Sequence, residues 1–402
     1  MSELAFLLKY SLRNLFRNHK RTMLMIFSLS LGCAYILWVL NFANSSSKEI
    51  INEFLSQNTG RYVLTNKNFY EDNNKKKFNF YKVIDQNIEL DKDISQFITP
   101  RVVAPVFISG QSKTIGLLLT GIDVSRELEL STIKDAVTIG NFISPNDENT
   151  ILLGIRFAKK IQANIGDDVA ILGQGLDGSM ANELFRVVGL MNFGGGDLEE
   201  AMAFTQLKSS QNLLSIPHNK VHQLVNFSMQ DTPLPESSDF VSTHWKDLLP
   251  EISVSMQFID NFTWIVCIVI VLVLSLGLSN TLMITFLERE SEFNTLNIIG
   301  AQMRWVCLSL IIEVLILGTT ALIIGTVFGY LLTMFFYYYP INIEWFTGGQ
   351  PIYLGGMTIT PLVRVHSHLD YYWKVPLIIY GFLMLTMIYP LMKVIRRSRN
   401  VL

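Results

Sequence analysis

Four long apolar runs interrupt an otherwise mixed pattern of hydrophobic and polar positions. They cover residues 22–44, 262–287, 305–336 and 375–395. A helix needs roughly 20 apolar residues to cross the hydrocarbon core of a membrane, so each run predicts a transmembrane helix. The third run is longer than a bilayer requires, which indicates that its helix tilts or projects beyond the membrane.

Lysine and arginine residues flank both ends of this pattern. Such residues are retained in cytoplasmic segments next to membrane helices, so both termini are predicted to be cytoplasmic, in agreement with an even number of spans. Residues 45–261 then lie on the far side, and they contain 19 Lys and Arg against 27 Asp and Glu. A cleaved signal peptide is the alternative for the first run, although that run is long for one and no small-x-small site follows it. The flanking basic residues are Lys9, Arg13, Arg17, Lys20 and Arg21 before the first run, and Lys393, Arg396, Arg397 and Arg399 after the fourth.

Residues 1–21 form an element of their own before the first span. Their apolar positions recur at helical spacing, while the basic residues fall elsewhere on the helical wheel. This pattern predicts a cytoplasmic amphipathic helix lying on the anionic inner leaflet. A solvated basic helix that touches a partner protein is the alternative. The apolar positions are Leu4, Leu7, Leu8, Leu12, Leu15 and Phe16.

The insert of residues 45–261 is long enough for one or two domains. Helical periodicity at 50–55 predicts that the first membrane helix continues outward as a stalk. Alternating or continuous apolar runs predict strands, and other segments have helical spacing, so the insert is predicted to be an α/β domain with stalk helices. The predicted strands are 61–65, 101–109, 114–120, 169–172, 184–190 and 223–229, and the predicted helices are 155–163, 206–214 and 237–249.

Composition agrees with a hybrid of membrane and polar parts. Of 402 residues, 50% are hydrophobic and 16% are charged, whereas soluble proteins contain about 25% charged residues. The mean hydropathy of +0.32 is nevertheless too low for a chain wholly in lipid. The predicted fold class is therefore an α-helical membrane protein with four transmembrane helices and a large α/β periplasmic domain inserted between helices 1 and 2. A net charge of -2 provides no basic field for nucleic acid.

No motif for catalysis or nucleotide binding occurs in the sequence. GxxxxGK[ST], G-x-S-x-G and H-E-x-x-H are absent, so no catalytic residue, metal or bound cofactor is predicted. His366 and His368 have H-x-H spacing in the outer loop 337–374, but no further ligand lies near them. Glu313 is ionisable inside the third span, which marks either a functional residue or a carboxylate satisfied by a neighbouring helix.

The cytoplasmic segment 288–304, between the second and third spans, has the pattern of a short amphipathic helix. Phe293, Leu296 and Ile299 fall on one stripe, acidic residues stand in the first turn, and Gly300 is placed as a C-terminal stop. A rigid helix attached to two spans would move both when it is pushed. An ordinary interfacial connector is the alternative.

This connector resembles that of the FtsX-like permease family of ABC transporters, which includes the lipoprotein-releasing LolC/LolE permeases and the MacB exporters. The resemblance covers nearly the whole chain. The basic entry 13–22 and the exit from Tyr389-Pro390 to Leu402 are similar to the family's termini, although the usual second proline near the end is missing. The connector residues that match the family pattern are Arg289, Glu292, Phe293, Leu296, Ile299, Gly300 and Ala301.

Short motifs within the insert resemble the lipoprotein-releasing branch in their order along the chain. One departure is the outer loop 337–374, which is longer than that branch leads us to expect. The motifs are Arg101-Val102-Val103, Gly121-Ile122-Asp123, Ile151-Leu152-Leu153-Gly154, Ile165-Gly166-Asp167-Asp168-Val169 and Phe185-Arg186-Val187-Val188-Gly189.

The resemblance implies a non-catalytic permease subunit in the inner membrane of a bacterium, with a tail at 396–402 in the cytoplasm. The family's fold implies an outer domain of two lobes. Two permeases, identical or different, would bind two cytoplasmic ATPases, which hold ATP and Mg²⁺. The residues expected to couple to the ATPase are Arg289, Glu290, Glu292, Phe293, Leu296, Ile299, Gly300 and Ala301.

The cargo implied by the resemblance is a lipoprotein extracted from membrane lipids toward the periplasm, with a periplasmic chaperone or adaptor as a further partner. An exporter of periplasmic peptides or drugs, working with an adaptor and an outer-membrane channel, is one alternative. A permease that moves no cargo and activates a cell-wall hydrolase is another. An apolar cleft between the first two spans is expected to hold the cargo, lined by Leu37, Leu40, Phe42, Phe262, Ile265 and Val269.

Overall fold

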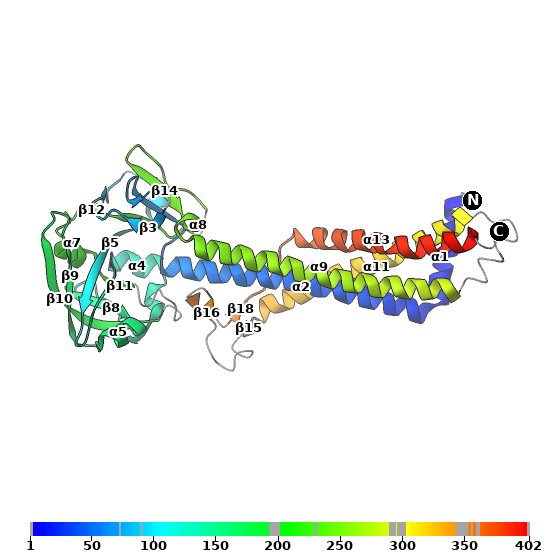
Figure 1. The fold of residues 1–402 in the computed structure, drawn as a ribbon, viewed down its shortest axis with the longest axis horizontal. Coiled ribbons are helices and arrows are strands. Elements are labelled where there is room, and N and C mark those ends of the chain that lie inside the picture. The colour runs from blue at the N-terminus through cyan, green and yellow to red at the C-terminus, as the bar shows by residue number, and fades with distance from the viewer. Residues whose placement is uncertain are drawn as a thin grey trace. The chain divides into compact units, whose positions relative to one another are not determined.

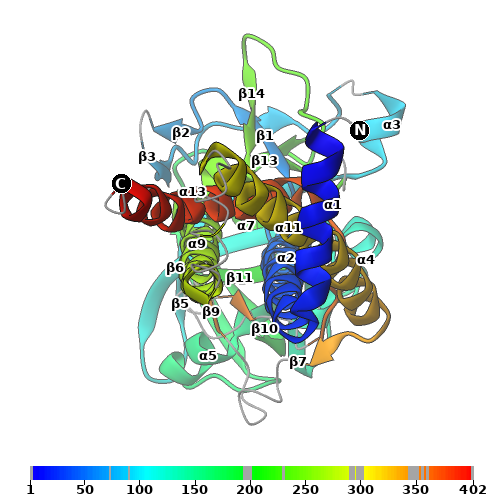
Figure 2. The ribbon, with the colours of Figure 1, turned by 90° about the vertical axis from the view of Figure 1, so that its right-hand side faces the viewer.

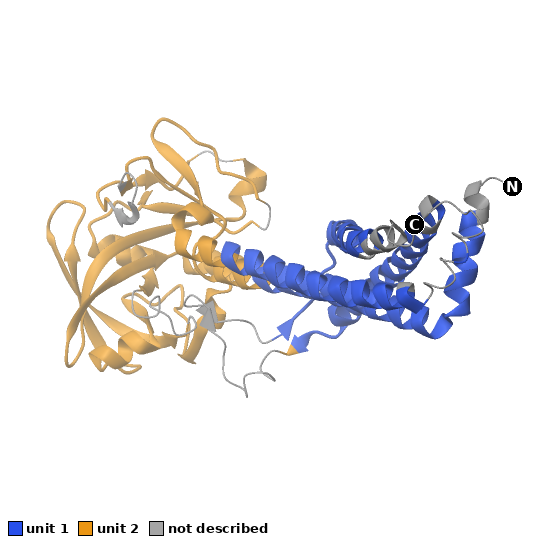
Figure 3. Cartoon of the chain, turned by 45° about the vertical axis from the view of Figure 1, so that its right-hand side comes forward, with its two compact units in different colours: residues 1–47, 257–341, 362–402 blue, residues 48–256, 342–361 orange. Residues whose placement is uncertain are grey.

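The computed structural model of the chain divides into two compact units, which are described separately (Figures 1 and 3). Unit 1 comprises residues 1–47, 257–341 and 362–402, and unit 2 comprises residues 48–256 and 342–361. The residues that the structure describes are 3–71, 74–88, 91–192, 202–228, 231–288, 295, 303–342, 353–354, 357–358 and 362–399.

Unit 1 is a bundle of long helices. In the described part of the chain, four helices are long and apolar enough to cross a membrane, and the α/β unit lies in sequence between the first two, so the predicted fold class is confirmed. The chain is a multi-pass membrane protein. A shorter helix, α1, lies across α11 (Figure 2). The helices are α1 (Glu3–Arg17), α2 (His19–Gln57), α9 (Pro250–Glu288), α11 (Met303–Tyr338) and α13 (Tyr371–Arg399).

Small residues allow α2 to approach its neighbours closely. A Cβ atom at Gly325 of α11 would lie 2.7 Å from the Ser30 carbonyl oxygen, and one at Gly329 would lie 3.0 Å from a Leu37 methyl group. On α2 itself, a Cβ atom at Gly32 would lie 2.3 Å from a Leu274 methyl group on α9. Helix association in lipid depends on such close packing, because the lipid is as apolar as the side chains.

Unit 2 is built on one large sheet with the strand order β14-β1-β13-β5-β6-β11-β8-β10-β7. The strand β9 pairs with both β10 and β5, so β5, β6, β11, β8, β10 and β9 close into a six-stranded barrel. The strands are β1 (Tyr62–Asn66), β5 (Ile98–Ser109), β6 (Thr114–Ile122), β7 (Val137–Gly140), β8 (Thr150–Gly154), β9 (Asp168–Gln174), β10 (Met180–Met191), β11 (Met202–Gln206), β13 (Gln223–Asn226) and β14 (Phe240–His244).

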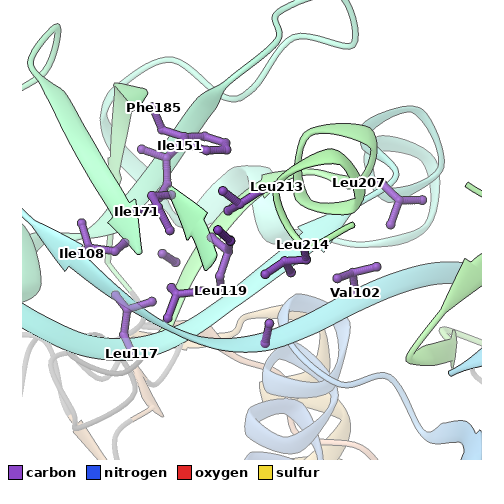
Figure 4. Close-up of a cluster of buried hydrophobic side chains, with 14 of the residues drawn as sticks. Val102, Ile108, Leu117, Leu119, Ile151, Ile171, Phe185, Leu207, Leu213 and Leu214 are labelled. Atoms are coloured by element: carbon purple, nitrogen blue, oxygen red, sulfur yellow. The ribbon is translucent and has the colours of Figure 1, made fainter. Parts of the chain in front are cut away.

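The core of unit 2 is formed by alternate residues of the barrel strands. Ile108, Leu119, Ile151, Ile171 and Phe185 come from five different strands and are fully buried in one hydrophobic cluster (Figure 4). Because side chains alternate between the two faces of a strand, one apolar set per strand is enough to fill the barrel. Every strand predicted in the insert overlaps a strand of this sheet. The division into two lobes stays a prediction, since a single sheet runs through the unit.

The remaining described elements are short helices and strands, and one of the predictions for the insert is wrong. The segment 237–249 was expected to be helical, but β14 occupies its middle and only Trp245–Leu248 is helical. Val241 and Thr243 are β-branched and pair with Thr65 and Val63 of β1, so ladder hydrogen bonds override the local helical spacing. The other elements are α3 (Lys92–Ser95), α4 (Val124–Leu130), η1 (Ile133–Ala136), α5 (Ile155–Ile161), α7 (Leu207–Leu213), α8 (Trp245–Leu248), β2 (Tyr70–Glu71), β3 (Asn74–Phe78), β4 (Ile84–Asp85), β12 (Lys220–Val221), β15 (Ile341–Asn342), β16 (Tyr353–Leu354), β17 (Met357–Thr358) and β18 (Leu362–Val363).

Candidate functional site

The connector expected to contact an ATPase lies in sequence between α9, which ends at Glu288, and α11, which begins at Met303. Its role stays a prediction, because the residues expected to couple to the ATPase lie outside the described residues. They are Arg289, Glu290, Glu292, Phe293, Leu296, Ile299, Gly300 and Ala301.

The end of α9 is bonded to the N-terminal corner, which we define as residues 11–22 at the end of α1 and the start of α2. Arg21 donates from Nη1 and Nη2 to the two carboxylate oxygens of Glu288, at 2.6 and 2.9 Å. Its Nη1 also donates to Thr285 Oγ1 at 3.1 Å. Such a two-pronged ion pair fixes orientation as well as distance. The sequence identified Arg21 as a topology signal and as part of the basic entry that resembles the family. Nothing local points to a partner so far along the chain.

A second pair of bonds joins the N-terminal corner to α11. The Ser11 hydroxyl donates to the Ser309 carbonyl at 3.2 Å, and Asn14 Nδ2 donates to Glu313 Oε1 at 2.9 Å. Ser309 and Glu313 lie one helical turn apart, as do Ser11 and Asn14, so the two helix faces match. Glu313 is only 8% exposed. Of the two interpretations of Glu313, this contact supports the satisfied carboxylate.

A cavity with an empty volume of about 460 Å³ opens at the N-terminal corner, between the ends of α1, α2, α9 and α11. Its walls include guanidinium groups, amides and a carboxylate beside aliphatic side chains. Because both signs of charge are present, the lining selects no single class of ion. The polar lining residues are Asn14, Arg17, Asn18, Arg21, Thr22, Thr285 and Glu313, and the apolar ones are Leu15, Met25, Leu282, Val314 and Leu317.

The cargo cleft stays a prediction, and the six residues predicted to line it differ in burial. Leu37 and Leu40 are buried in the bundle core and Phe42 is half-buried, whereas Phe262, Ile265 and Val269 are all more than half exposed. An apolar crevice of about 230 Å³ lies among α2, α9 and α13. Sequence periodicity could not find it, because every face of these spans is apolar. The crevice is lined by Ile36, Trp264, Cys267, Ile268, Val271, Val375, Ile378 and Ile379.

Backbone amides of the H-x-H segment, just before α13, bond to side chains of α2. The His366 amide donates to Ser45 Oγ at 2.7 Å, and the His368 amide donates to Asn41 Oδ1 at 2.8 Å. The His366 ring packs edge-on against Tyr337. Among the described residues, no three His, Cys, Asp or Glu side chains gather as metal ligands. In the described structure this segment therefore serves helix packing.

Within unit 2, the last turns of α2 and the first residues of α9 lead into neighbouring strands. β1 begins at Tyr62, five residues after α2 ends, and β14 ends at His244, just before α8 and α9. The two strands are antiparallel, with Tyr62 opposite His244. A displacement of one helix end relative to the other would therefore act along the β1–β14 ladder.

Comparisons with known proteins found a matching family model and similar solved structures. Residues 264–399 match the family model described as FtsX-like permease C-terminal. A search of curated protein sequences found no match. The solved periplasmic region of MacB from Actinobacillus actinomycetemcomitans is similar over 51% of this chain and 97% of that chain, with 12% identity and a TM-score of 0.31. The extracellular domain of the noncanonic ABC-type transporter YknZ from Gram-positive bacteria is similar over 42% of this chain and 84% of that chain, with 12% identity and a TM-score of 0.28. TM-scores this low support no argument about function.

The matched region contains the third and fourth spans, most of the second span, and the connector between the second and third spans. It agrees with the permease family that the connector residues resemble. Over residues 264–399 the chain is therefore similar to the C-terminal region of FtsX-like permeases.

Proposed function

We propose that the chain is the non-catalytic permease subunit of a mechanotransmission-type ABC transporter that extracts lipoproteins from the bacterial inner membrane toward the periplasm. Both termini would be cytoplasmic and unit 2 would be periplasmic. The observation that supports this most directly is the FtsX-like match over residues 264–399. A second supporting observation is that the helices α2 and α9 each contain residues of both units.

A separate ATPase that binds ATP and Mg²⁺ would push the connector 288–304. We call the resulting conformational change of the permease the stroke. The connector's flanking helices are both bonded to the N-terminal corner, through Arg21 and Glu288 on one side and Asn14 and Glu313 on the other. These contacts favour joint movement of α9, α11 and the start of α2. At the other end of α2 and α9, the β1–β14 ladder would receive the displacement.

A lipoprotein suits such a machine on energetic grounds. Each buried CH₂ of an acyl chain holds the cargo in the membrane by about 0.8 kcal/mol, so extraction requires coupling to a strongly favourable reaction such as ATP hydrolysis. Apolar side chains are available on the outer half of α9, where Phe262, Ile265 and Val269 are exposed. A second permease, identical or different, would supply the facing wall of the cleft, and a periplasmic chaperone would receive the cargo.

The test is a reconstitution of the permease with its ATPase in liposomes that contain a lipoprotein. Leu296→Asp places a charge on the apolar stripe of the connector, so we expect loss of the ATPase complex or of ATP-driven release. Asn294→Asp adds the same charge on the opposite side of the predicted helix and is the matched control. If Leu296→Asp assembles with the ATPase and releases cargo like the unchanged protein, the coupling assignment is wrong.

The same preparation separates the two alternatives. Co-purification with an adaptor and an outer-membrane channel would indicate an exporter, whereas co-purification with a soluble lipoprotein chaperone would support release. ATP turnover without cargo release would favour a regulator of cell-wall hydrolases.

A further inference from the structure

A buried ion pair lies where α2 ends inside unit 2. Arg101 on β5 donates from Nε and Nη2 to the two carboxylate oxygens of Glu127 on α4, at 2.7 and 3.0 Å. The two residues are 3% and 0% exposed. The guanidinium carbon also lies 5.3 Å from the centre of the Phe227 ring. Each partner is therefore held in one orientation inside the domain.

The remaining guanidinium nitrogen of Arg101 reaches the end of the stalk. Its Nη1 donates to the main-chain carbonyl of Asn58, the residue that follows the last residue of α2. Carbonyl groups at a helix C-terminus have no partner within the helix and bear partial negative charge, so a buried cation is well suited to them. Arg101 thus connects the end of α2 to α4 and to a barrel strand.

The carboxylate of Glu127 is fixed by its own surroundings. Asp123 caps the N-terminus of α4 by accepting from the amides of Ser125 and Arg126, and the Thr99 hydroxyl donates to Glu127 Oε1 at 2.8 Å. Burial alone would raise the pKa of Glu127, but the charge and hydrogen bonds of Arg101 outweigh it and lower the pKa below its ordinary value. Glu127 is therefore ionised at neutral pH.

A second contact joins the same helix end to the residues after α4. The Thr132 amide donates to the Ser56 carbonyl at 3.1 Å, and the two side-chain hydroxyls lie 2.7 Å apart. The end of α2 is thus bonded laterally at Ser56 in its last turn and at Asn58 directly after it, in addition to its covalent connection to β1.

Stability alone does not account for the ion pair, because apolar side chains of similar volume fill such sites without the cost of removing two charges from water. The pair instead provides directed bonds to three elements at once. We propose that Arg101 is a positioning residue that, together with Glu127, transmits the displacement of α2 to the barrel strand β5. This inference rests on the proposed function, since it concerns the path of the same stroke.

The test compares full-length permeases assembled with their ATPase in liposomes. Arg101→Met combined with Glu127→Leu replaces the pair by apolar groups and keeps the site filled, so the barrel is expected to fold. Arg126→Met is the matched control, because Arg126 bonds α4 to the Ile98 and Ser95 carbonyls and does not contact α2. Hydrogen exchange is followed with and without ATP, along with ATP turnover and lipoprotein release.

In the unchanged protein and in Arg126→Met, ATP should alter the exchange of the β5 amides, residues 98–109. In the double variant this response should fall about tenfold, as loss of a coupling contact allows, while ATP turnover is retained and exchange of residues 57–61 rises. If β5 responds to ATP in the double variant as in the unchanged protein, the proposal is overturned. An unchanged protein that shows the β5 response but releases no lipoprotein would instead contradict the proposed cargo and leave Arg101 in its role.

Discussion

The two units use polar and apolar side chains in opposite ways. In the helix bundle, many of the most exposed residues are large and apolar, such as Phe27 and Leu276, while Asn41, Ser309 and Thr333 are buried. In the barrel unit the fully buried residues are mostly apolar, and the strands and loops present charged side chains to the outside. The difference indicates two solvents, because lipid covers apolar surface without cost and water does not.

A buried carboxylate in each unit illustrates the same contrast. Glu127 of the barrel faces Arg101, and the two charges offset one another at hydrogen-bond distance. Glu313 of the bundle receives an amide hydrogen bond from Asn14. In the barrel the contact orients a helix end, and in the bundle it docks α1 on α11. Buried polar groups therefore fix the arrangement of elements in both units, although the surrounding solvent differs.

The largest effect is expected from a large side chain placed at a glycine where two helices of the bundle touch. Gly325→Leu would force α11 away from α2, because even a Cβ atom there meets the Ser30 carbonyl and the Cys33 side chain at 2.7 and 2.8 Å. We expect a loss of about 3 kcal/mol or more, measured as the yield of folded protein and its thermal unfolding in lipid nanodiscs.

Gly381→Leu is the control for this experiment, since nothing lies within 4 Å of a Cβ atom at that position on α13. It should leave folding unchanged. Equal behaviour of the two variants would mean that α2 and α11 do not pack through Gly325.

Replacing an exposed apolar residue by aspartate in each unit tests whether that residue faces lipid or water. Leu276 on α9 is 65% exposed and Met180 on β10 is 87% exposed, yet only Leu276 is expected to face lipid. Leu276→Asp should cost about 3 kcal/mol in membrane insertion, whereas Met180→Asp should stay within about 0.5 kcal/mol. Carbonate-resistant membrane yield and thermal unfolding measure the two effects. Tolerance of Leu276→Asp would indicate that this face of α9 meets water or a polar partner.

Much of the fold was predictable because its signals are local. A run of 20 apolar residues identifies a span by length alone. Alternating or continuous apolar runs identified the barrel strands β5, β6, β9 and β10, whereas the short strands β8 and β11 were not predicted. Closure of the barrel was not predictable, since it depends on β9 pairing with β5 across more than 50 residues. The segment 240–244 was misassigned for the same reason, because its partner strand β1 determines its conformation.

The candidate site was predictable only in part. Arg101 stood in a motif that resembles the family, but nothing in the sequence points to Glu127 as its partner. The role of the N-terminal corner was equally hidden, because Arg21 meets Glu288 at a separation of 267 residues. Contacts of this kind depend on three-dimensional packing, which single-sequence periodicity does not encode.

The smallest predicted effect is a pH dependence confined to the barrel unit. His222 is fully buried. Its Nδ1 accepts from the Val103 amide at 3.1 Å, and its Nε2 lies 2.8 Å from the Phe80 carbonyl, to which it donates. Burial lowers the pKa of His222 to about 4 from an ordinary value of 6.5, and the bond to Phe80 opposes part of that shift.

Between these two pKa values the unfolded chain binds a proton that the folded chain does not, so stability falls as the pH drops below about 6.5. From pH 7 to pH 5 we expect a loss of about 2 kcal/mol, measured by hydrogen exchange of the β5 and β13 amides in the full-length protein. His222→Gln should remove this part of the slope, whereas His218→Gln, on an exposed residue, should retain it. Because Glu127 has a pKa below its ordinary value, it stays ionised over this range, and a slope that persists in His222→Gln would mean that another group titrates.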